Sequence, residues 1–526
     1  MKETKVEDPK EKWYLLIVIS CSLLFFVVVS LFISNVQYVG GAEDAEHANL
    51  AQNLAAGKGF VSDGIALYFR PYAAVSHPGD AAAPLTPLLI ALLFKIFGIS
   101  AFVAKLPSLF AGLVALPILV FILGKKLYTP FVGFVSALIT LFSPINFPTT
   151  VHAEAELLFA VFSLAACLFF IKGFENPRSF LLMGVALGIA YLTKYTTILT
   201  IFGIVLAYGI ISYRTRKRSH SHFALGMMLT LVIMLPWLIR NYLLFGDPLY
   251  AVGRHVAAFF GLLPDTRFPI NGMSPTFIYA VSALGLQGLL KKFFAQAVRA
   301  IFAPELILYV LGIMGAYYSE YRAKILLPAQ FFTFFAFHTI YWIYFPNYFI
   351  FVNALLVCST VHLIHTILPE RITRSRENQI RKFAHIFLFT LILFFFFFAL
   401  SKFFVSLTFQ GTLTQEASYP FRDSEGTISI MENTNWVRVH LNPGEPVFVA
   451  RGPWGFAFHS QHPTLVIPEE GFSRLLGLAR EYGVNYTQCD IPNVPLPHQE
   501  LEVVSTIRGM SFCKILWEQV NPEQIN

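Results

Sequence analysis

Charged residues are scarce in this 526-residue chain, in which Asp, Glu, Lys and Arg together make up 13% of the sequence. Soluble domains carry about 25% of these residues, so the composition excludes an ordinary soluble enzyme. Cysteine is scarce too, with five residues and no C-x-x-C pair, which excludes the usual zinc and thiol-redox motifs. Hydrophobic residues instead make up 56% of the chain, which contains 55 phenylalanines. These features predict an integral membrane protein.

The basic residues, which give a net charge of +7, stand in short clusters between apolar runs, a pattern that does not indicate nucleic-acid binding. The positive-inside rule places such clusters in the cytoplasm. The first apolar run, 13–34, has no charged residue and is long enough to span a bilayer. A signal peptide would have a shorter apolar core and a small-residue cleavage site. We therefore expect an uncleaved first span with a cytoplasmic N-terminus, in the plasma or inner membrane.

Ten further apolar runs alternate with the basic clusters, which predicts about eleven transmembrane helices in all. They lie at roughly 102–123, 130–147, 155–172, 179–194, 196–213, 222–239, 301–319, 325–344, 347–367 and 383–402. The clusters between them lie at 125–126, 172–178, 214–218, 322–324 and 370–382. The run 84–98 is shorter and contains Lys95, so it is either a tilted span or a helix at the membrane surface. All the basic clusters fall on the cytoplasmic side only if this run does not cross the membrane completely.

Composition divides the chain into two domains. Residues 1–403 form the predicted α-helical polytopic domain, with an outer loop at about 36–83. In that loop, 45–56 is predicted to be a short helix, ended by glycines. Residues 404–526 have an ordinary globular composition. Because an odd number of spans puts the C-terminus outside, they form a predicted small extracytoplasmic α/β domain.

Within this second domain, short β-rich runs surround a helical stretch at 471–483. The β-rich runs are 446–450, 464–468, 484–491 and 512–520. Cys489 and Cys513 both lie here, in a compartment where a disulfide persists. The sequence alone does not show whether they are close enough to pair.

Acidic and basic residues gather on the predicted outer side of the membrane. Acids follow the first span and precede a later one, and cations end two others. The candidate site residues are Glu43, Asp44, His77, Glu154, Glu156, Lys194 and Arg240, with Glu46, Asp80 and His152 nearby. A carboxylate can take a proton from an attacking hydroxyl, and Lys or Arg can hold a phosphate. The pattern favours a reaction with an anionic leaving group.

Five of these residues also have a structural interpretation. Glu43, Asp44 and Glu154 suit the acidic first turn of a helix. Lys194 could be a snorkelling lysine, and Arg240 could be an anchor at the interface.

Four segments resemble the GT-C superfamily of membrane glycosyltransferases. The first, 43–60, reads E-D-x-x-H-x-x-x-A-x-N-L-x-x-G-x-G-F and resembles the first-loop motif of that superfamily. The segment 84–98 begins P-L-x-P-L-L and resembles its Pro-Pro-Leu segment, GIAYLTKYT at 188–196 resembles the stretch with its phosphate-binding lysine, and 236–250 resembles another recurrent segment. The similarity covers roughly 14–370 and is greatest to the branch of protein O-mannosyltransferases and lipid A aminoarabinose transferases.

The resemblance implies an inverting transfer of a sugar from a polyprenyl-phosphate donor to a protein, lipid or glycan acceptor at the outer face. Glu43 stands where the superfamily usually has its catalytic Asp, and Asp44 where it has the following Glu. The order is swapped, which leaves open which of the two is the base. Glu156, and after it Glu154, matches the second acidic site, and Lys194 would contact the lipid phosphate.

Some GT-C enzymes use a divalent cation between their two acidic sites and others do not. Glu43, Asp44 and Glu156 would suit Mg²⁺ or Mn²⁺. The superfamily has a Lys or His just before its Pro-Pro-Leu segment, whereas His77 lies seven residues before Pro84.

A transporter or lipid flippase that uses the same outer carboxylates is the alternative. Such proteins bind substrates near the bilayer midplane, between internal repeats. The acids here lie at one surface and no inverted repeat is apparent, so the transferase is favoured.

Overall fold

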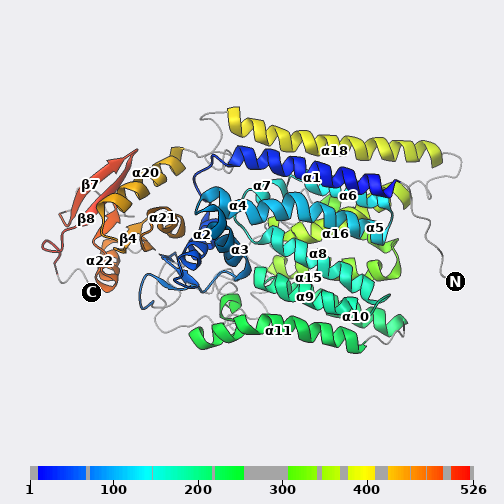
Figure 1. The fold of residues 1–526 in the computed structure, drawn as a ribbon, viewed down its shortest axis with the longest axis horizontal. Coiled ribbons are helices and arrows are strands. Elements are labelled where there is room, and N and C mark those ends of the chain that lie inside the picture. The colour runs from blue at the N-terminus through cyan, green and yellow to red at the C-terminus, as the bar shows by residue number, and fades with distance from the viewer. Residues whose placement is uncertain are drawn as a thin grey trace.

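The computed structural model describes residues 10–66, 72–144, 146–215, 220–253, 306–340, 346–367, 377–408, 425–450, 452–468, 471–489 and 499–521. A bundle of roughly parallel helices forms one part of the molecule, and a smaller region with the sheet lies at one end of it (Figure 1). The predicted class, a polytopic helical membrane protein with a small C-terminal α/β region, is confirmed.

Within the described residues, every predicted span coincides with a helix. These helices are α1 (Glu11–Ile33), α4, η1 and α5 (together 101–127), α6 (Pro130–Leu141), α8 (Glu156–Gly173), α9 (Ser179–Thr193), α10 (Thr197–Thr215), α11 (His220–Phe245), α14 (Leu306–Tyr317), α15 (Tyr321–Ile340), α16 (Ile350–His362) with η3 (Leu363–Ile367), and α18 (Glu377–Thr408). Six of the described helices are at least 18 residues long and apolar enough to cross a membrane. Parts of the basic clusters 214–218 and 370–382 lie outside the described residues.

The second span is a helix with a local irregularity. α4 (Ala101–Phe110) contains Pro107, η1 (Ala111–Ala115) is one π-helical turn, and α5 (Leu116–Leu127) begins with a proline in its first turn. A proline has no N–H to donate to the preceding turn and its ring crowds the carbonyl four residues back. The π turn therefore lies between two points where regular α-helical bonding is interrupted.

Small residues let two of the spans approach closely. A Cβ at Gly184 of α9 would collide with the Gly226 carbonyl group of α11, and a Cβ at Gly226 would collide with the Phe180 carbonyl group of α9. Close approach at small residues is the usual way in which helices associate in a membrane, where burial of apolar side chains gives little driving force.

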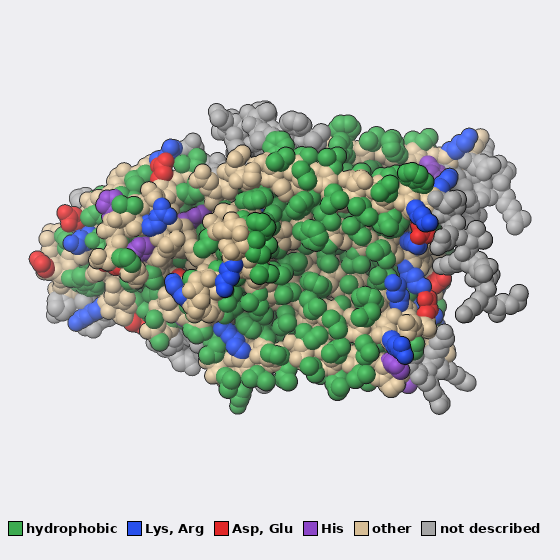
Figure 2. Space-filling model, in the orientation of Figure 1, with side chains coloured by type: hydrophobic (Ala, Val, Ile, Leu, Met, Phe, Trp, Pro, Cys, Tyr) green, Lys and Arg blue, Asp and Glu red, His purple; other side chains and the backbone are tan. Residues whose placement is uncertain are grey.

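The outer surface of the bundle is apolar over its middle and charged at its ends (Figure 2). At the end away from the sheet, Lys126 and Arg322 both contact Glu175, at 2.6 Å and 3.3 Å. Lys125 pairs with Glu11 at the start of α1. This distribution suits a molecule that crosses a bilayer along the long axis of the bundle.

The outer loop begins with α2 (Ala42–Ala55) and ends with α3 (Leu85–Phe97). Between them, β1 (Val61–Ser62) pairs antiparallel with β3 (His77–Pro78). The 13 residues of α3 extend about 20 Å, which is short of a hydrocarbon core of about 30 Å.

A six-stranded sheet forms the core of the region at the end of the bundle. Its strands, in spatial order, are β2 (Gly64–Ile65), β5 (Thr464–Val466), β4 (Val447–Val449), β6 (Tyr486–Gln488), β8 (Met510–Ile515) and β7 (Leu501–Ile507). The first four run parallel, and β8 and β7 are antiparallel to their neighbours. The helices of this region are α20 (Glu425–His440), α21 (Pro453–Ser460) and α22 (Phe472–Tyr482). The edge strand β2 comes from the outer loop, so the sheet is built from both predicted domains.

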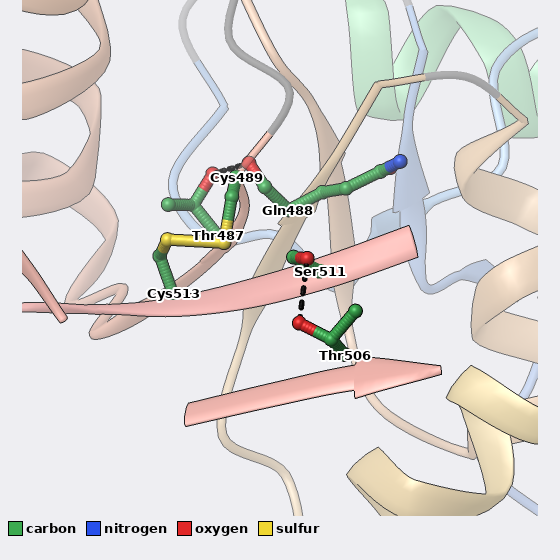
Figure 3. The surroundings of a disulfide bond; sticks show 6 residues. All are labelled: Thr487, Gln488, Cys489, Thr506, Ser511 and Cys513. Atoms are coloured by element: carbon green, nitrogen blue, oxygen red, sulfur yellow. Dashed lines mark hydrogen bonds between the residues drawn. A yellow bond between two sulfur atoms is a disulfide. The ribbon is translucent and has the colours of Figure 1, made fainter. Parts of the chain in front are cut away.

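Cys489 and Cys513 form a disulfide (Figure 3). Their Cα atoms are 5.2 Å apart, and the bond joins the end of β6 to β8. A hydroxyl hydrogen bond of 2.8 Å between Thr506 and Ser511 links β7 to β8 nearby. The pairing that the sequence left open is therefore made.

Candidate active site

Helix α2 lies at the end of the bundle next to the sheet, and it has two acidic residues in its first turn. Gly41 is the residue before the helix, and its N–H donates to Asp44 Oδ2 at 3.1 Å. This contact satisfies one of the helix-terminal donors that would otherwise lack a partner. Asp44 is buried, with 1% of its surface exposed. Glu43, one position earlier, points to another set of partners.

The first group of charges is centred on Lys194, which follows the last residue of α9. Its Nζ lies 3.2 Å from Glu43 Oε1 and also donates to Glu156 Oε1, at the start of α8. Glu156 is buried, while the Glu43 side chain is 37% exposed. The ring of Tyr348, in η2 (Pro346–Phe349), lies 5.0 Å from the same ammonium group. One cation thus sits between two carboxylates and an aromatic face.

The second group comprises Asp44, His152 and Glu154. Nδ1 of His152 donates to Asp44 Oδ2 at 2.8 Å. One ligand atom from each of the three residues lies within 4.8 Å of the others. Among the described residues, no hydrogen-bond donor reaches Asp44 Oδ1, although this atom is buried. Such a set of oxygen and nitrogen donors can hold a divalent cation.

Burial raises the pKa of Glu154 well above its ordinary value, and the charges of Glu156, Asp44 and Glu43 raise it further, whereas Lys194 opposes them. The neutral form of this carboxyl group is therefore favoured until a cation offsets the surrounding negative charge.

Two hydrogen bonds hold the segment that carries His152 and Glu154, between α7 (Asn146–Thr150) and α8. His47 of α2 is buried and its Nδ1 donates to Ala153 O at 2.8 Å. Ser108 of α4 donates to Glu154 O at 2.7 Å. Burial lowers the pKa of His47, so its ring stays neutral and serves as a polar link between α2 and this segment.

Arg240 lies beside these groups in an aromatic box. Its guanidinium carbon is 4.6 Å from the ring centre of Trp237, 5.4 Å from that of Phe60 and 5.2 Å from that of Phe245. Trp237 donates from Nε1 to the Tyr195 hydroxyl at 2.9 Å, and Tyr195 directly follows Lys194. Arg240 is thus connected to the lysine through two aromatic side chains.

His77 belongs to a cluster within the outer loop. Its Nδ1 donates to Val75 O at 2.8 Å, and its Nε2 lies 3.9 Å from Asp80 Oδ1. The Tyr72 ring centre is 4.2 Å from that of His77, and the Tyr72 hydroxyl donates to Asp80 Oδ2 at 3.1 Å. The contacts described for His77 therefore order the loop that precedes α3.

The structure groups the predicted acids differently from the expected metal set. Asp44 lies with His152 and Glu154, whereas Glu43 and Glu156 share Lys194. Sequence reasoning gave no role to Tyr348 or His47. The spacing H-x-E-x-E at 152–156 would have singled out His152. For Tyr348, the only signal is the Pro-Asn turn before it at the outer end of a span.

Comparisons with known proteins bear on this site. The family model for dolichyl-phosphate-mannose-protein mannosyltransferase matches residues 76–239, a segment that contains His77, Glu154, Glu156 and Lys194. No curated protein matches the chain at a significant level.

Solved structures with the same fold include two membrane glycosyltransferases. ArnT from Cupriavidus metallidurans, bound to undecaprenyl phosphate, is 15% identical with a TM-score of 0.60, over 94% of this chain and 97% of ArnT. The Archaeoglobus fulgidus oligosaccharyltransferase, tethered with an acceptor peptide that contains the NVT sequon, is 12% identical with a TM-score of 0.57, over 89% of this chain and 69% of that protein. The same enzyme in complex with Zn and sulfate gives 11% identity and a TM-score of 0.57.

At these identities the structural similarity shows the fold, and the family model adds a match in sequence. The expected resemblance is confirmed, and the transporter alternative finds no support in these comparisons. The chain therefore has the fold of the ArnT and oligosaccharyltransferase structures, and its residues 76–239 match the family model for dolichyl-phosphate-mannose-protein mannosyltransferase.

Proposed function

We propose that this enzyme transfers a sugar from a polyprenyl-phosphate donor to a glycan, lipid or protein acceptor at the outer face of the membrane, with inversion at the anomeric carbon. The observation that carries the proposal is the pairing of Lys194 with Glu43 and Glu156, near the end of the bundle next to the sheet. ArnT, which shares the fold, binds undecaprenyl phosphate, and a partly buried ammonium group suits the phosphate of such a lipid.

In the proposed reaction, an acceptor hydroxyl attacks the anomeric carbon as the bond from that carbon to the phosphate oxygen breaks. The electron pair of this bond leaves with polyprenyl phosphate. Lys194 stabilises the charge that grows on the phosphate, and Glu156 holds the lysine in place. Arg240, in its aromatic box, adds positive charge on the same side.

Glu43 is the proposed general base. Its side chain is 37% exposed, so an acceptor can reach it, whereas Asp44 is buried and already accepts from Gly41 and His152. A donor phosphate that binds Lys194 competes with Glu43 for the ammonium group. Glu43 is then released to take the proton of the acceptor.

A divalent cation fits Asp44, His152 and Glu154, because Asp44 Oδ1 is buried and lacks a donor among the described residues. Such an ion would supply Lewis-acid stabilisation of negative charge on the phosphate. The mixed oxygen and nitrogen donors suit Mn²⁺ or Zn²⁺ better than Mg²⁺. The related oligosaccharyltransferase was crystallised with Zn.

The proposed location is the plasma or inner membrane, with the N-terminus in the cytoplasm and the C-terminal region outside. The charge distribution supports this orientation, since Lys125, Lys126 and Arg322 lie at the end away from the sheet. The positive-inside rule assigns that end to the cytoplasm.

The test uses purified full-length protein with short-chain polyprenyl-phosphate sugars and follows the release of polyprenyl phosphate. We expect Glu43→Gln and Lys194→Ala each to lower turnover by about 100-fold or more, the size of effect seen when one group of this kind is removed. Asp44→Asn should lower turnover, relative to wild type, by less in the presence of EDTA than in the presence of Mn²⁺. Lys126→Ala, at the other end of the molecule, is the matched control and should behave as wild type.

Unchanged turnover in Glu43→Gln would exclude this residue as the base. No release from any donor, with acceptor extracts present, would overturn the proposed function.

A further inference from the structure

The linker from α1 to the catalytic helix α2 is held by side chains from separate parts of the molecule. The N–H of Val39 donates to His459 Nε2 at 3.3 Å. Nζ of Lys105 donates to the carbonyl oxygen of Tyr38 at 3.2 Å. These two bonds lie immediately before Gly41, where Asp44 closes the first turn of α2. The backbone that leads into α2 is therefore fixed from both sides.

His459 comes from α21 of the C-terminal region, 420 positions after Val39 in the sequence. Its ring stacks on that of Tyr38, with centres 5.5 Å apart and planes 18° apart. The neighbouring carbonyl oxygen of Phe458 accepts from Gln52 of α2 at 3.3 Å. Contact between α21 and the start of the outer loop is thus made by several groups.

The bond from Val39 requires a neutral His459 ring. An Nε2 that accepts must leave the proton on Nδ1. Burial, and then the charge of Lys105, lower the pKa of His459 to about 4. Among the described residues, the titratable groups given beside the ring are Lys105 of α4 and Tyr38 of the linker, and the Phe458 ring packs edge-on against it. Both the burial and the nearby cation act in the same direction, so the ring remains an acceptor at neutral pH.

We propose that His459 is a positioning residue for the sugar transfer. By holding Val39, it places Glu43 against Lys194 and Asp44 against His152. This inference rests on the proposed function. Lys194 and Glu156 are held by α9 and α8, so loss of the bond moves one side of the site and leaves the other. A displacement of about 1 Å at reacting groups costs up to about 100-fold in rate, and the effect should fall on kcat.

The experiment compares His459→Ala, His459→Gln and His440→Ala in the full-length protein. His440 is the matched control, an exposed histidine of α20 that stacks on Trp436 in the same region. We measure kcat and KM for transfer and Kd for short-chain polyprenyl phosphate. His459→Ala should lower kcat by about 10- to 100-fold and change Kd by less than about twofold, the size of effect expected when Lys194 keeps its place.

His459→Gln should recover most of the rate, because its side-chain oxygen can accept from Val39 near the position of Nε2. A Gln variant no better than Ala, or an effect of His459→Ala confined to KM and Kd, would overturn the proposal. If His459→Ala does not fold, Gly455→Ala replaces it, since the added Cβ would lie 3.1 Å from the Tyr38 hydroxyl.

Failure of the proposed function is distinguishable. If the wild type transfers no sugar, amide hydrogen exchange at residues 39–41 still reports on the hydrogen bond between Val39 and His459. Exchange should be faster in His459→Ala than in wild type and His459→Gln. Equal exchange in all three would overturn the positioning role by itself.

Discussion

Glu43 and Asp44 are adjacent in the sequence, yet their carboxyl groups have different surroundings. Asp44 turns back to cap its own helix and meets His152, whereas Glu43 reaches Lys194. Successive residues on a helix point about 100° apart, which directs the two side chains to two separate groups. One helical turn therefore supplies both the proposed base and a proposed cation ligand.

Glu154 gives a prediction at the residue scale. Its folded-state pKa is raised by burial and by neighbouring acids, so the folded protein binds its proton more tightly than the unfolded chain does. At a pH below the ordinary pKa, Glu154 is protonated in both the folded and the unfolded state, so it does not lower the free energy of unfolding. As pH rises toward the folded-state value, the unfolded state ionises first and stability is lost.

Glu154→Gln mimics the neutral form. Without added metal it should therefore have a higher Tm than wild type at pH 8 and the same Tm at pH 4, measured by thermal unfolding in detergent with EDTA. Added Mn²⁺ should raise the Tm of wild type more than that of the variant, since the cation removes the cost in wild type. Glu502→Gln, at an exposed position on β7, should match wild type throughout. A lower Tm for Glu154→Gln at pH 8 would contradict the prediction.

At the scale of elements, the crossing of α9 and α11 depends on Gly184 and Gly226. Gly184→Ala would push a methyl group into the Gly226 carbonyl, and overpacking of this kind costs about 1–3 kcal/mol. We expect a lower Tm in detergent. Gly209→Ala of α10 is the control, because nothing lies within 4 Å of the added Cβ and alanine favours a helix by up to about 1 kcal/mol. Equal Tm values for the two variants would contradict the role of the crossing.

Most elements follow from local signals in the sequence, and the exceptions have physical reasons. Long apolar runs without charge predict the spans, because a bilayer demands them. Helix α2 was expected from 45 and begins at Ala42, because the Asp44 contact with Gly41 extends it by a turn. Strand β2 has two residues and no pattern of its own, so only tertiary pairing with β5 reveals it. Strand β7 and helices α20 and α21 were likewise not predicted.

The candidate site was predictable in part for a similar reason. The outer acids and Lys194 stand out because charge is rare in this chain, and the structure brings Glu43, Glu156 and Lys194 together. Tyr348 carries no such signal, since 16% of the sequence is Phe, Trp or Tyr, and His459 is one of 14 histidines with no motif around it. Their positions depend on the packing of distant segments.

At the scale of the whole molecule, the protein has three zones along its long axis: a charged end, an apolar middle and, at the other end, the region with the sheet (Figure 2). The Cys489–Cys513 bond lies at the level of the sheet and closes a loop with a sequence separation of 24. Loss of such a cross-link costs about 3 kcal/mol in the chain-entropy account. The double variant Cys489→Ser/Cys513→Ser should therefore unfold at a lower temperature than wild type.

Thiol labelling of denatured protein checks the same bond. Wild type should react at three cysteines, because Cys21, Cys167 and Cys358 are free, and at five after reduction. Five reactive thiols without reduction would show that the bond does not form in the cell and would place the C-terminal region in a reducing compartment.

Strand β2 also sets an order on biosynthesis. Gly64 pairs with Thr464, so the first loop leaves the ribosome some 400 residues before its partner strand exists. During that interval, the later spans must be inserted while the loop lacks its sheet. In the proposed orientation, the final contacts around α2 form only when the last part of the chain has been translocated. A product that stops after the last span therefore lacks a completed first loop.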